Sequence, residues 1–283
     1  MIDIEHRRVL MCPPDYFTVR DVKNPFMASG APVDHDLAKR QWSAVGDAFT
    51  SAGVTVEKID AVEDLEDMVF AANQVFVGTD SAGTRFIVPS AMRYESRARE
   101  VPHYVRWFKQ HGFRTIDLRL DAGAGEYLEG HGDLLRHPNR AHVWAGYGFR
   151  STLAGVRKFT EAMEREEIAG VMPLELVDET FYHLDTCFVP LTSHAALVYS
   201  PALSAGALAS LRGAFKRLHD VSREDAMQFA CNGVPVNGYF IASHLSDALW
   251  KVVRNEGLKP VIVDTSEFEK AGGSVFCLKV FLD

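Results

Sequence analysis

The segment Asp36–Ile59, DLAKRQWSAVGDAFTSAGVTVEKI, carries the pattern from which we predict the fold. Over its first part, apolar side chains recur at near-helical spacing, at Leu37, Trp42, Val45 and Phe49. Gly53 then ends the predicted helix, and Val54–Ile59 alternates as a half-buried strand does. Because the short apolar run Val9–Met11 precedes the segment, the pattern predicts a strand–helix–strand unit.

The same order of elements returns four more times along the chain. Helices are predicted over Ser96–Gln110, Leu153–Glu167, Ala205–Leu218 and Leu245–Glu256. Strands precede them at Phe86–Val88, His142–Trp144, Ala196–Tyr199 and Tyr239–Ile241, and strands follow at Thr115–Leu118, Val171–Val177 and Pro260–Val263. Further apolar strands are predicted at Val75–Val77, Cys187–Val189 and Ser274–Leu282. Five ββαβ units in a ring would form a five-bladed α/β propeller closed by the two termini, and an open α/β sheet with additions is the alternative.

Length and composition indicate one globular domain over residues 1–283. Hydrophobic residues make up 47% and charged residues 24%, and no low-complexity or Gly/Ser-rich linker divides the chain. The formal net charge of −8 argues against a nucleic-acid partner, because there is no excess of cations for a phosphate backbone. No apolar run approaches the roughly 18 residues of a membrane span, so no membrane partner is expected.

The N-terminal residues and the cysteines favour a cytoplasmic location. The stretch Met1–Arg8 is too charged for a signal peptide. The cysteines lie far apart without a Cys-x-x-Cys pair, at Cys12, Cys187, Cys231 and Cys277. We therefore expect free thiols rather than a disulfide framework or a zinc site, and one thiol is a candidate nucleophile.

The first segment suited to chemistry is Glu129–Asp133, EGHGD. Its two carboxylates flank a Gly-x-Gly stretch, and glycines let the backbone approach a ligand closely. A tight turn with exposed acids is the alternative. The second segment is His183–Thr186, HLDT. In a strand, His183 and Asp185 would project from the same face, which suits proton transfer and cation binding, and a satisfied edge histidine is the alternative.

The third segment is Gly272–Cys277, GGSVFC, where a Gly-Gly turn delivers Cys277 near the start of the last predicted strand. A thiolate there would be a nucleophile, although a buried core cysteine is the commoner case. The fourth segment places Asn73 at a junction before a strand, followed by Arg93, Arg97 and Arg99. Arginines can bind a carboxylate bidentately, and a solvated helix face is the alternative, which we prefer for Arg99.

In this order, the four segments resemble those of the guanidino-group-modifying enzymes, which include arginine deiminase, dimethylarginine dimethylaminohydrolase (a dimethylargininase), the amidinotransferases and arginine dihydrolase. The resemblance covers nearly the whole chain and implies the pentein fold, a five-bladed α/β propeller with its site in the central channel. It is nearest to arginine dihydrolase and its dimethylargininase-like bacterial neighbours. The dihydrolases carry asparagine where most other members carry aspartate, and Asn73 follows that pattern, although Asp80 competes as the aligned carboxylate.

The resemblance also implies roles for individual residues. Glu129 and Asp185 are expected to hold a guanidinium, which would favour the thiolate of Cys277. Cys277 would attack the guanidino carbon, and His183 would protonate the leaving nitrogen and then activate water, with Asp185 as a candidate to orient it. Further binding roles are expected for Asn73, for Arg93 and secondarily Arg97 at the substrate carboxylate, and for Asn24 in a lid. No metal or organic cofactor is expected.

Free arginine is the expected substrate, and two hydrolytic steps would end at ornithine, carbon dioxide and two ammonia. A deiminase or a dimethylarginine dimethylaminohydrolase would stop at citrulline. An amidinotransferase, or a non-catalytic pentein that acts by binding, are the remaining alternatives. The oligomeric state stays open, with a homo-oligomer possible, as do the roles of His131 and Asp80.

Overall fold

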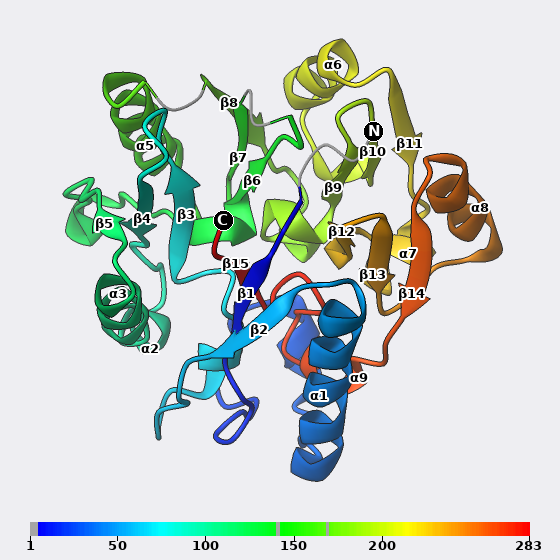
Figure 1. Cartoon of the computed structure of the whole chain (residues 1–283), viewed down its shortest axis with the longest axis horizontal. Coiled ribbons are helices and arrows are strands. Elements are labelled where there is room, and N and C mark those ends of the chain that lie inside the picture. Colours follow the sequence, from blue (N-terminus) through cyan, green and yellow to red (C-terminus); the bar gives the residue numbers. More distant parts are fainter. Residues whose placement is uncertain (1–4, 140–141, 168–169) are drawn as a thin grey trace.

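The computed structural model describes residues 5–139, 142–167 and 170–283. Within these residues the strands form five three-stranded sheets arranged around a common centre (Figure 1). The sheets, in their strand order, are β15 (Val280–Phe281), β1 (Arg8–Met11) and β2 (Thr55–Lys58); β3 (Val75–Thr79), β4 (Arg85–Pro89) and β5 (Arg114–Thr115); β6 (Leu134–Arg136), β7 (His142–Tyr147) and β8 (Gly170–Glu175); β9 (Phe188–Thr192), β10 (Ala195–Val198) and β11 (Arg217–Asp220); and β12 (Val234–Val236), β13 (Tyr239–Ala242) and β14 (Lys259–Ile262).

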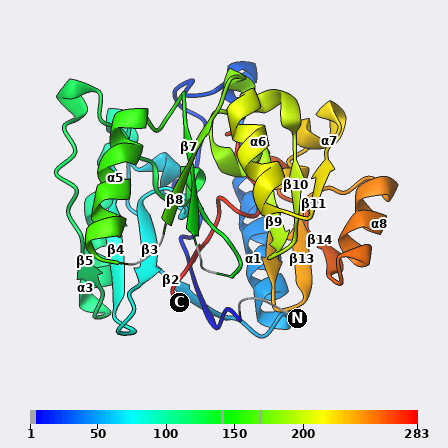
Figure 2. The ribbon, with the colours of Figure 1, turned by 90° about the horizontal axis from the view of Figure 1, so that it is seen from above.

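Every sheet repeats one pattern of pairing. The first two strands are antiparallel and the last two are parallel, so a helix must cross over between the second strand and the third. The crossover helices are α1 (His35–Ser51), α3 (Val101–Gln110), α5 (Leu153–Arg165), α6 (Ala205–Ala214) and α8 (Asp247–Asn255). They lie around the outside of the ring, with α5 and α8 towards opposite ends of the view from above (Figures 1 and 2). The predicted five-bladed propeller is confirmed.

The first sheet joins the two ends of the chain. Strand β1 pairs with β15 in an antiparallel register that places Val9 opposite Phe281 and Leu10 opposite Val280. The Arg7 amide also donates to the Asp283 carboxylate over 2.6 Å. The termini therefore close the ring, as the sequence predicted.

Shorter helices fill the connections between these elements. The α-helical ones are α2 (Glu95–Ala98), α4 (Gly130–Asp133), α7 (Arg223–Met227) and α9 (Ser266–Glu269). The 3₁₀ helices are η1 (Pro25–Ser29), η2 (Glu66–Val69), η3 (Ala122–Ala124), η4 (Glu179–Phe181), η5 (Leu184–Thr186), η6 (Ser200–Ala202) and η7 (Ala230–Asn232). Several of the site residues described below belong to these short elements.

Four predicted elements differ clearly from the observed ones, and the first is the strand predicted over 115–118, which is confined to β5 at residues 114–115. The helix predicted over 96–110 is divided into α2 and α3, because Pro102 at the start of α3 cannot continue a preceding helix. The helix predicted over 205–218 ends at Ala214, since residues 217–220 pair with β10 as strand β11. The strand predicted over 274–282 is confined to β15, because the amides of Leu278 and Lys279 bond backward to Ser274 and Phe276 in turns.

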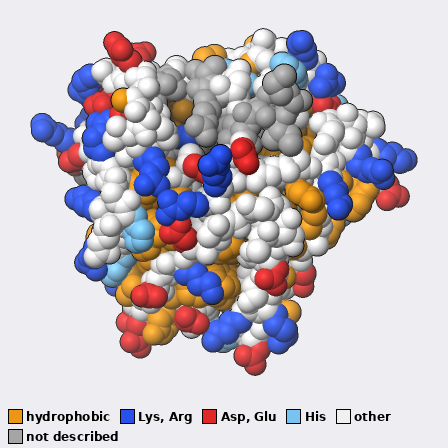
Figure 3. Space-filling model, viewed as in Figure 1, with side chains coloured by type: hydrophobic (Ala, Val, Ile, Leu, Met, Phe, Trp, Pro, Cys, Tyr) orange, Lys and Arg blue, Asp and Glu red, His pale blue; other side chains and the backbone are white. Residues whose placement is uncertain are grey.

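The outer surface carries interspersed acidic and basic side chains on the face shown in Figure 3. No helix within the described residues combines the length and apolar character needed to cross a membrane. Large buried side chains pack between neighbouring blades, with Trp144 of β7 against Phe188 of β9 and Phe159 of α5 against Phe76 of β3. Packing of this kind leaves the axis of the ring for the polar residues described next.

Candidate active site

Side chains from distant parts of the chain line one small cavity on the axis. Its volume is about 10 Å³, room for about one water molecule. The lining residues are Asn24, Met27, Asp67, Phe70, Asn73, Arg97, Arg150, Tyr182, His183, Ala271, Gly273 and Cys277. The predicted site residues Asn24, Asn73, Arg97, His183 and Cys277 are therefore brought together.

Glu129 lies directly behind His183. Its Oε2 accepts from His183 Nε2 over 2.8 Å and from Arg150 Nη1 over 2.9 Å, and its Oε1 accepts from the Arg93 amide over 2.9 Å. Burial alone would raise the pKa of Glu129, but Arg150 and His183 hold that pKa well below its usual range. The Glu129 carboxylate can only accept, so this contact fixes the orientation of the His183 ring and its donating nitrogen.

Glycine is required where the EGHGD turn passes under these side chains. A Cβ on Gly132 would stand 2.3 Å from Asn73 Nδ2 and 3.1 Å from the His183 ring, so only a residue without a side chain fits. Gly130 has φ +50°, and a Cβ there would stand 2.5–2.8 Å from the carbonyl oxygens of Ala72, Asn73 and Val75. The Gly-x-Gly stretch therefore lets His183 and Asn73 meet over one backbone turn.

Cys277 is held by two polar side chains. Its Sγ lies 3.2 Å from Asp185 Oδ2 and 3.3 Å from Asn232 Nδ2, while Asn232 Oδ1 accepts from the amides of Ser274 and Cys277. Burial and the Asp185 carboxylate raise the pKa of the Cys277 thiol well above its usual value. In the absence of substrate the thiol therefore stays protonated and donates to Asp185.

Asp185 lies beside Cys277 but, like Glu129, outside the residues that line the cavity. Burial raises its pKa to about 7 despite the hydrogen bond to Cys277, and within the described residues its Oδ1 has no hydrogen-bond partner. A cation placed beside Asp185 and Cys277 would lower both pKa values by direct attraction. The pair is therefore suited to a substrate that brings its own positive charge.

Asn73 presents an amide to the cavity. Its Oδ1 accepts from Arg97 Nη1 over 3.2 Å, and because arginine only donates, this contact fixes the amide orientation. The buried Nδ2 of Asn73 has no hydrogen-bond partner within the described residues. Arg97 also donates hydrogen bonds to the Glu100 carboxylate and to the Asp67 carbonyl, so it fixes the position of this part of the cavity wall.

The segment around η1 covers the cavity. Asn24 accepts from the amides of Phe26 and Met27 and donates from Nδ2 to the Ala271 carbonyl over 2.9 Å. Beside it, Lys23 Nζ lies 3.0 Å from Asp67 Oδ2 and 3.2 Å from Glu66 Oε1, and all three side chains are buried. The segment is thus closed over the cavity by one buried ion-pair cluster.

Three details of the expected site differ in the structure. His183 and Asp185 do not share a strand face, because His183 is the N-cap residue of η5 and Asp185 lies within it. Glu129 is fully buried and does not line the cavity, so it contacts His183 rather than offering a free edge to a ligand. Asp185 contacts Cys277 and leaves the orientation of His183 to Glu129.

The remaining candidates lie outside the cavity lining. The exposed side chain of Arg93 donates to the Phe149 carbonyl. Its backbone amide donates a hydrogen bond to Glu129, which places Arg93 beside the site. Asp80 lies in the turn between β3 and β4, where it accepts from the amides of Ala82 and Thr84, so it does not compete with Asn73. His131 accepts from the Val77 amide on the far side of α4.

Sequence reasoning missed Arg150 and Asn232 as site residues. Arg150 is buried against Glu129 and packs on the rings of Tyr94 and Tyr182 at 4.7 and 4.8 Å. The sequence signal for Arg150 was its position two residues after the Gly-x-Gly stretch at residues 146–148, where no helical or strand periodicity explains a buried cation. Asn232 precedes Gly233 and resembles an ordinary turn residue in sequence.

Comparison with known proteins agrees with this geometry. A family model described as "N,N dimethylarginine dimethylhydrolase, eukaryotic" matches residues 13–281. The chain belongs to this family. As a family member it is a hydrolase of carbon–nitrogen bonds in linear amidines, and the resemblance to guanidino-group-modifying enzymes is confirmed.

Two relatives of this dimethylargininase-family chain frame its activity. The N(G),N(G)-dimethylarginine dimethylaminohydrolase of Mycobacterium tuberculosis is 36% identical over 276 residues, which cover 96% of this chain and 84% of the relative. The bifunctional arginine dihydrolase/ornithine cyclodeaminase ArgZ of Synechocystis is 34% identical over 274 residues, and the match covers 96% of this chain but 37% of ArgZ.

Solved structures of ArgZ match the family member closely. A cysteine-to-serine variant of the ArgZ N-terminal domain bound to substrate has a TM-score of 0.89 at 32% identity, with 97% of each chain covered. The same domain bound to product has a TM-score of 0.90 at 32% identity, covering 99% of this chain and 98% of that one. A dimethylarginine dimethylaminohydrolase structure at 19% identity and TM-score 0.73 supports the fold alone.

Proposed function

We propose that this chain is an arginine dihydrolase, which converts free arginine and two water molecules into ornithine, carbon dioxide and two ammonia. The observation that carries the choice is Asn73, whose unpaired amide Nδ2 lies in the cavity wall. A carboxylate there would attract the guanidinium but could only accept hydrogen bonds. An amide donor can hold the oxygen of the neutral ureido group that remains after the first hydrolysis.

The relatives support this choice without deciding it. Besides ArgZ, the bifunctional arginine dihydrolase/ornithine cyclodeaminase AgrE of Nostoc is 34% identical over 96% of this chain. An asparagine-to-serine variant of the ArgZ N-terminal domain has been solved covalently bound to a reaction intermediate. Because this chain covers only 37% of both proteins, their cyclodeaminase activity is not part of the proposal.

The first hydrolysis begins when the guanidinium enters beside Asp185 and Cys277. Its charge lowers the pKa of Cys277, the thiol proton passes to His183, and the thiolate sulfur forms a bond to the guanidino carbon. His183, held by Glu129, protonates one terminal nitrogen, which leaves as ammonia and yields a cationic thiouronium joined to Cys277. Burial of the pair keeps bulk water away from this intermediate.

Water then completes the step. Neutral His183 removes a proton as the water oxygen attacks the thiouronium carbon, and the carbon–sulfur bond breaks to give citrulline and free Cys277. In the second round, Cys277 attacks the ureido carbon whose oxygen Asn73 holds, and the second ammonia leaves to give a thiocarbamate. Water cleaves its carbon–sulfur bond, which frees Cys277 and gives the carbamate of ornithine, and this decomposes to ornithine and carbon dioxide. Arg93 at the edge of the site is the proposed partner of the substrate carboxylate.

A dimethylarginine dimethylaminohydrolase is the second candidate, favoured by the family model and by 36% identity to the mycobacterial enzyme. Product analysis separates the two. We expect arginine to give two ammonia per ornithine, without citrulline accumulating at completion. One ammonia with citrulline would indicate a deiminase, and dimethylamine released from dimethylarginine with arginine inert would support the second candidate.

A further inference from the structure

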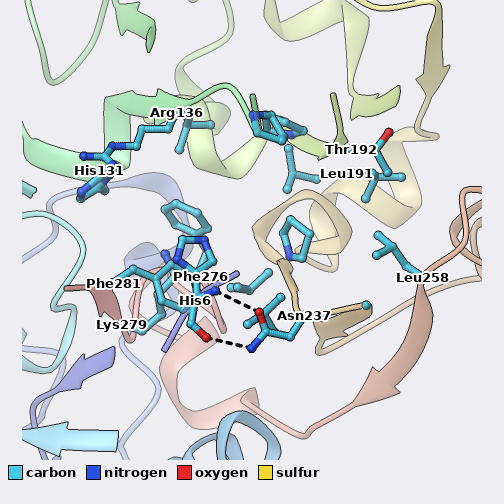
Figure 4. A pocket seen from close by; sticks show the side chains of 18 of the residues that line it. His6, His131, Arg136, Leu191, Thr192, Asn237, Leu258, Phe276, Lys279 and Phe281 are labelled. Atoms are coloured by element: carbon cyan, nitrogen blue, oxygen red, sulfur yellow. Dashed lines mark hydrogen bonds between the residues drawn. The ribbon is translucent and has the colours of Figure 1, made fainter. Parts of the chain in front are cut away.

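A second, larger cavity lies at the other end of the ring axis. It has a volume of about 220 Å³ and shares none of its lining residues with the candidate active site. The first strand of every sheet contributes to its wall, through Phe281 of β15, Val77 of β3, Leu135 of β6, Leu191 of β9 and Val236 of β12. The cavity is therefore the far mouth of the central channel (Figure 4).

Most of this wall is apolar, but one buried cation belongs to it. Lys279 lines the cavity with 2% of its surface exposed, and its Nζ lies 3.2 Å from the centre of the Phe276 ring and 5.1 Å from that of Phe281. Within the described part of the chain, no hydrogen bond or ion pair to this Nζ is found. The two rings offer an ammonium only partial compensation for lost hydration.

The two acidic side chains that line the cavity, Asp283 and Glu256, already have hydrogen-bond or ion-pair partners. Asp283 accepts from His6 Nδ1 over 3.0 Å and from the Arg7 amide, and Glu256 is paired with Arg217 and His219. Hydrogen bonds between His6 and Asn237 hold one side of the wall, as the dashed lines in Figure 4 show. Among the described residues, no acid that lines this cavity therefore pairs with Lys279, although Asp185 and Cys277, which lie outside the lining, attract its charge.

We propose that the far mouth of the channel binds a small organic monoanion, a carboxylate with an apolar body, whose charged group pairs with Lys279. The apolar walls formed by Val77, Leu135, Leu191 and Leu258 exclude a ligand that is only an ion. The volume is below the roughly 300–1,000 Å³ of sites for larger ligands, which limits the body to a short chain or a single ring. Burial lowers the pKa of Lys279 to about 7, and a bound anion would restore its charge.

The test is calorimetric titration of the full chain with hexanoate, its neutral counterpart hexanamide and inorganic phosphate. We expect hexanoate to bind, hexanamide to bind at least tenfold more weakly, and phosphate not to bind. Lys279→Met should weaken hexanoate at least tenfold, whereas Lys251→Met, on the exposed side of α8, should not. Because removing an unpaired buried charge relieves a cost, Lys279→Met should fold at least as stably, which a melting curve checks.

Hexanoate binding should persist when the candidate active site is filled with arginine in a Cys277→Ser background. Displacement by arginine would place the ligand at the candidate active site and overturn the proposal. Equal binding to the Lys279→Met variant, or equally tight phosphate, would also overturn it. These measurements do not depend on turnover, so they can fail while the proposed dihydrolase activity holds.

Discussion

His183 Nε2 and Glu129 Oε2 lie 2.8 Å apart in a wall where both side chains are buried, and Arg150 binds the same oxygen over 2.9 Å. The arrangement fixes both the position and the tautomer of the imidazole. Glu129→Gln keeps the shape but removes the charge, so we expect kcat to fall by about 10²–10⁴, the usual contribution of acid–base catalysis. Steady-state kinetics with arginine measures this.

Glu256→Gln is the matched control for Glu129→Gln. Glu256 is also a buried carboxylate paired with an arginine and a histidine, Arg217 and His219, but it lies outside the candidate active site. Both variants lose a carboxylate that has two ionic partners and should lose stability. A fall in kcat of similar size in both would trace the effect to stability and contradict the positioning role of Glu129.

Asn73→Asp tests the second hydrolysis. The new carboxylate would pair with Arg97, which now bonds to Asn73 Oδ1, and it would remove the amide donor from the cavity. We expect citrulline to accumulate and the yield of ornithine to fall at least tenfold, as measured by chromatography of the products. If ornithine still forms at the wild-type rate, Asn73 does not select the second step.

Asp185→Asn should change the thiol and the turnover in opposite directions. Since the Asp185 carboxylate raises the pKa of Cys277, its removal should lower that pKa, seen as thiolate absorption appearing at lower pH. Turnover should fall because the guanidinium loses its partner.

In the wild-type protein Asp185 has a pKa raised to about 7, so substrate binding near that pH should release protons, which calorimetry in two buffers detects. An unchanged thiol titration would contradict the account.

Lys23→Met tests whether the segment over the cavity must open. A cavity of about 10 Å³ cannot hold arginine, so the segment from Lys23 to Met27 must move and separate Lys23 from Asp67. Loss of that ion pair should speed alkylation of Cys277 several-fold, measured by peptide mass spectrometry. Lys39→Met, which removes an exposed pair with Asp15, is the control. Equal rates of Cys277 alkylation in the two variants would contradict the claim that the segment from Lys23 to Met27 opens over the cavity.

The fold was accessible from sequence because each blade repeats a physical pattern. Helix periodicity over α1 follows from the burial of one face of the helix, and the order of strands and helix recurs in five units. Strand β2, by contrast, is exposed at both ends and half-buried between them. The end of α6 was not accessible, because residues 217–220 join a sheet only through pairing with β10. The local helix or strand preference of residues 217–220 does not reveal that they pair with β10.

Only part of the candidate site was accessible in the same way. Cys277, His183 and Asn73 stand beside glycine turns or strand junctions that mark them in sequence. Asn232 contacts Cys277 across 45 positions and Arg150 contacts Glu129 across 21, and neither contact follows from a local pattern. The strand predicted for His183 and Asp185 was wrong because the segment forms a 3₁₀ turn, and that turn sends Asp185 to the sulfur.

The most direct test of the account is a rapid quench of the protein with arginine, followed by mass spectrometry of the intact chain and its peptides. We predict a transient mass increase equal to arginine minus ammonia, located on Cys277, and its absence together with turnover in Cys277→Ser. Turnover by Cys277→Ser, or an adduct on another residue, would contradict the claim that this sulfur attacks the guanidino carbon.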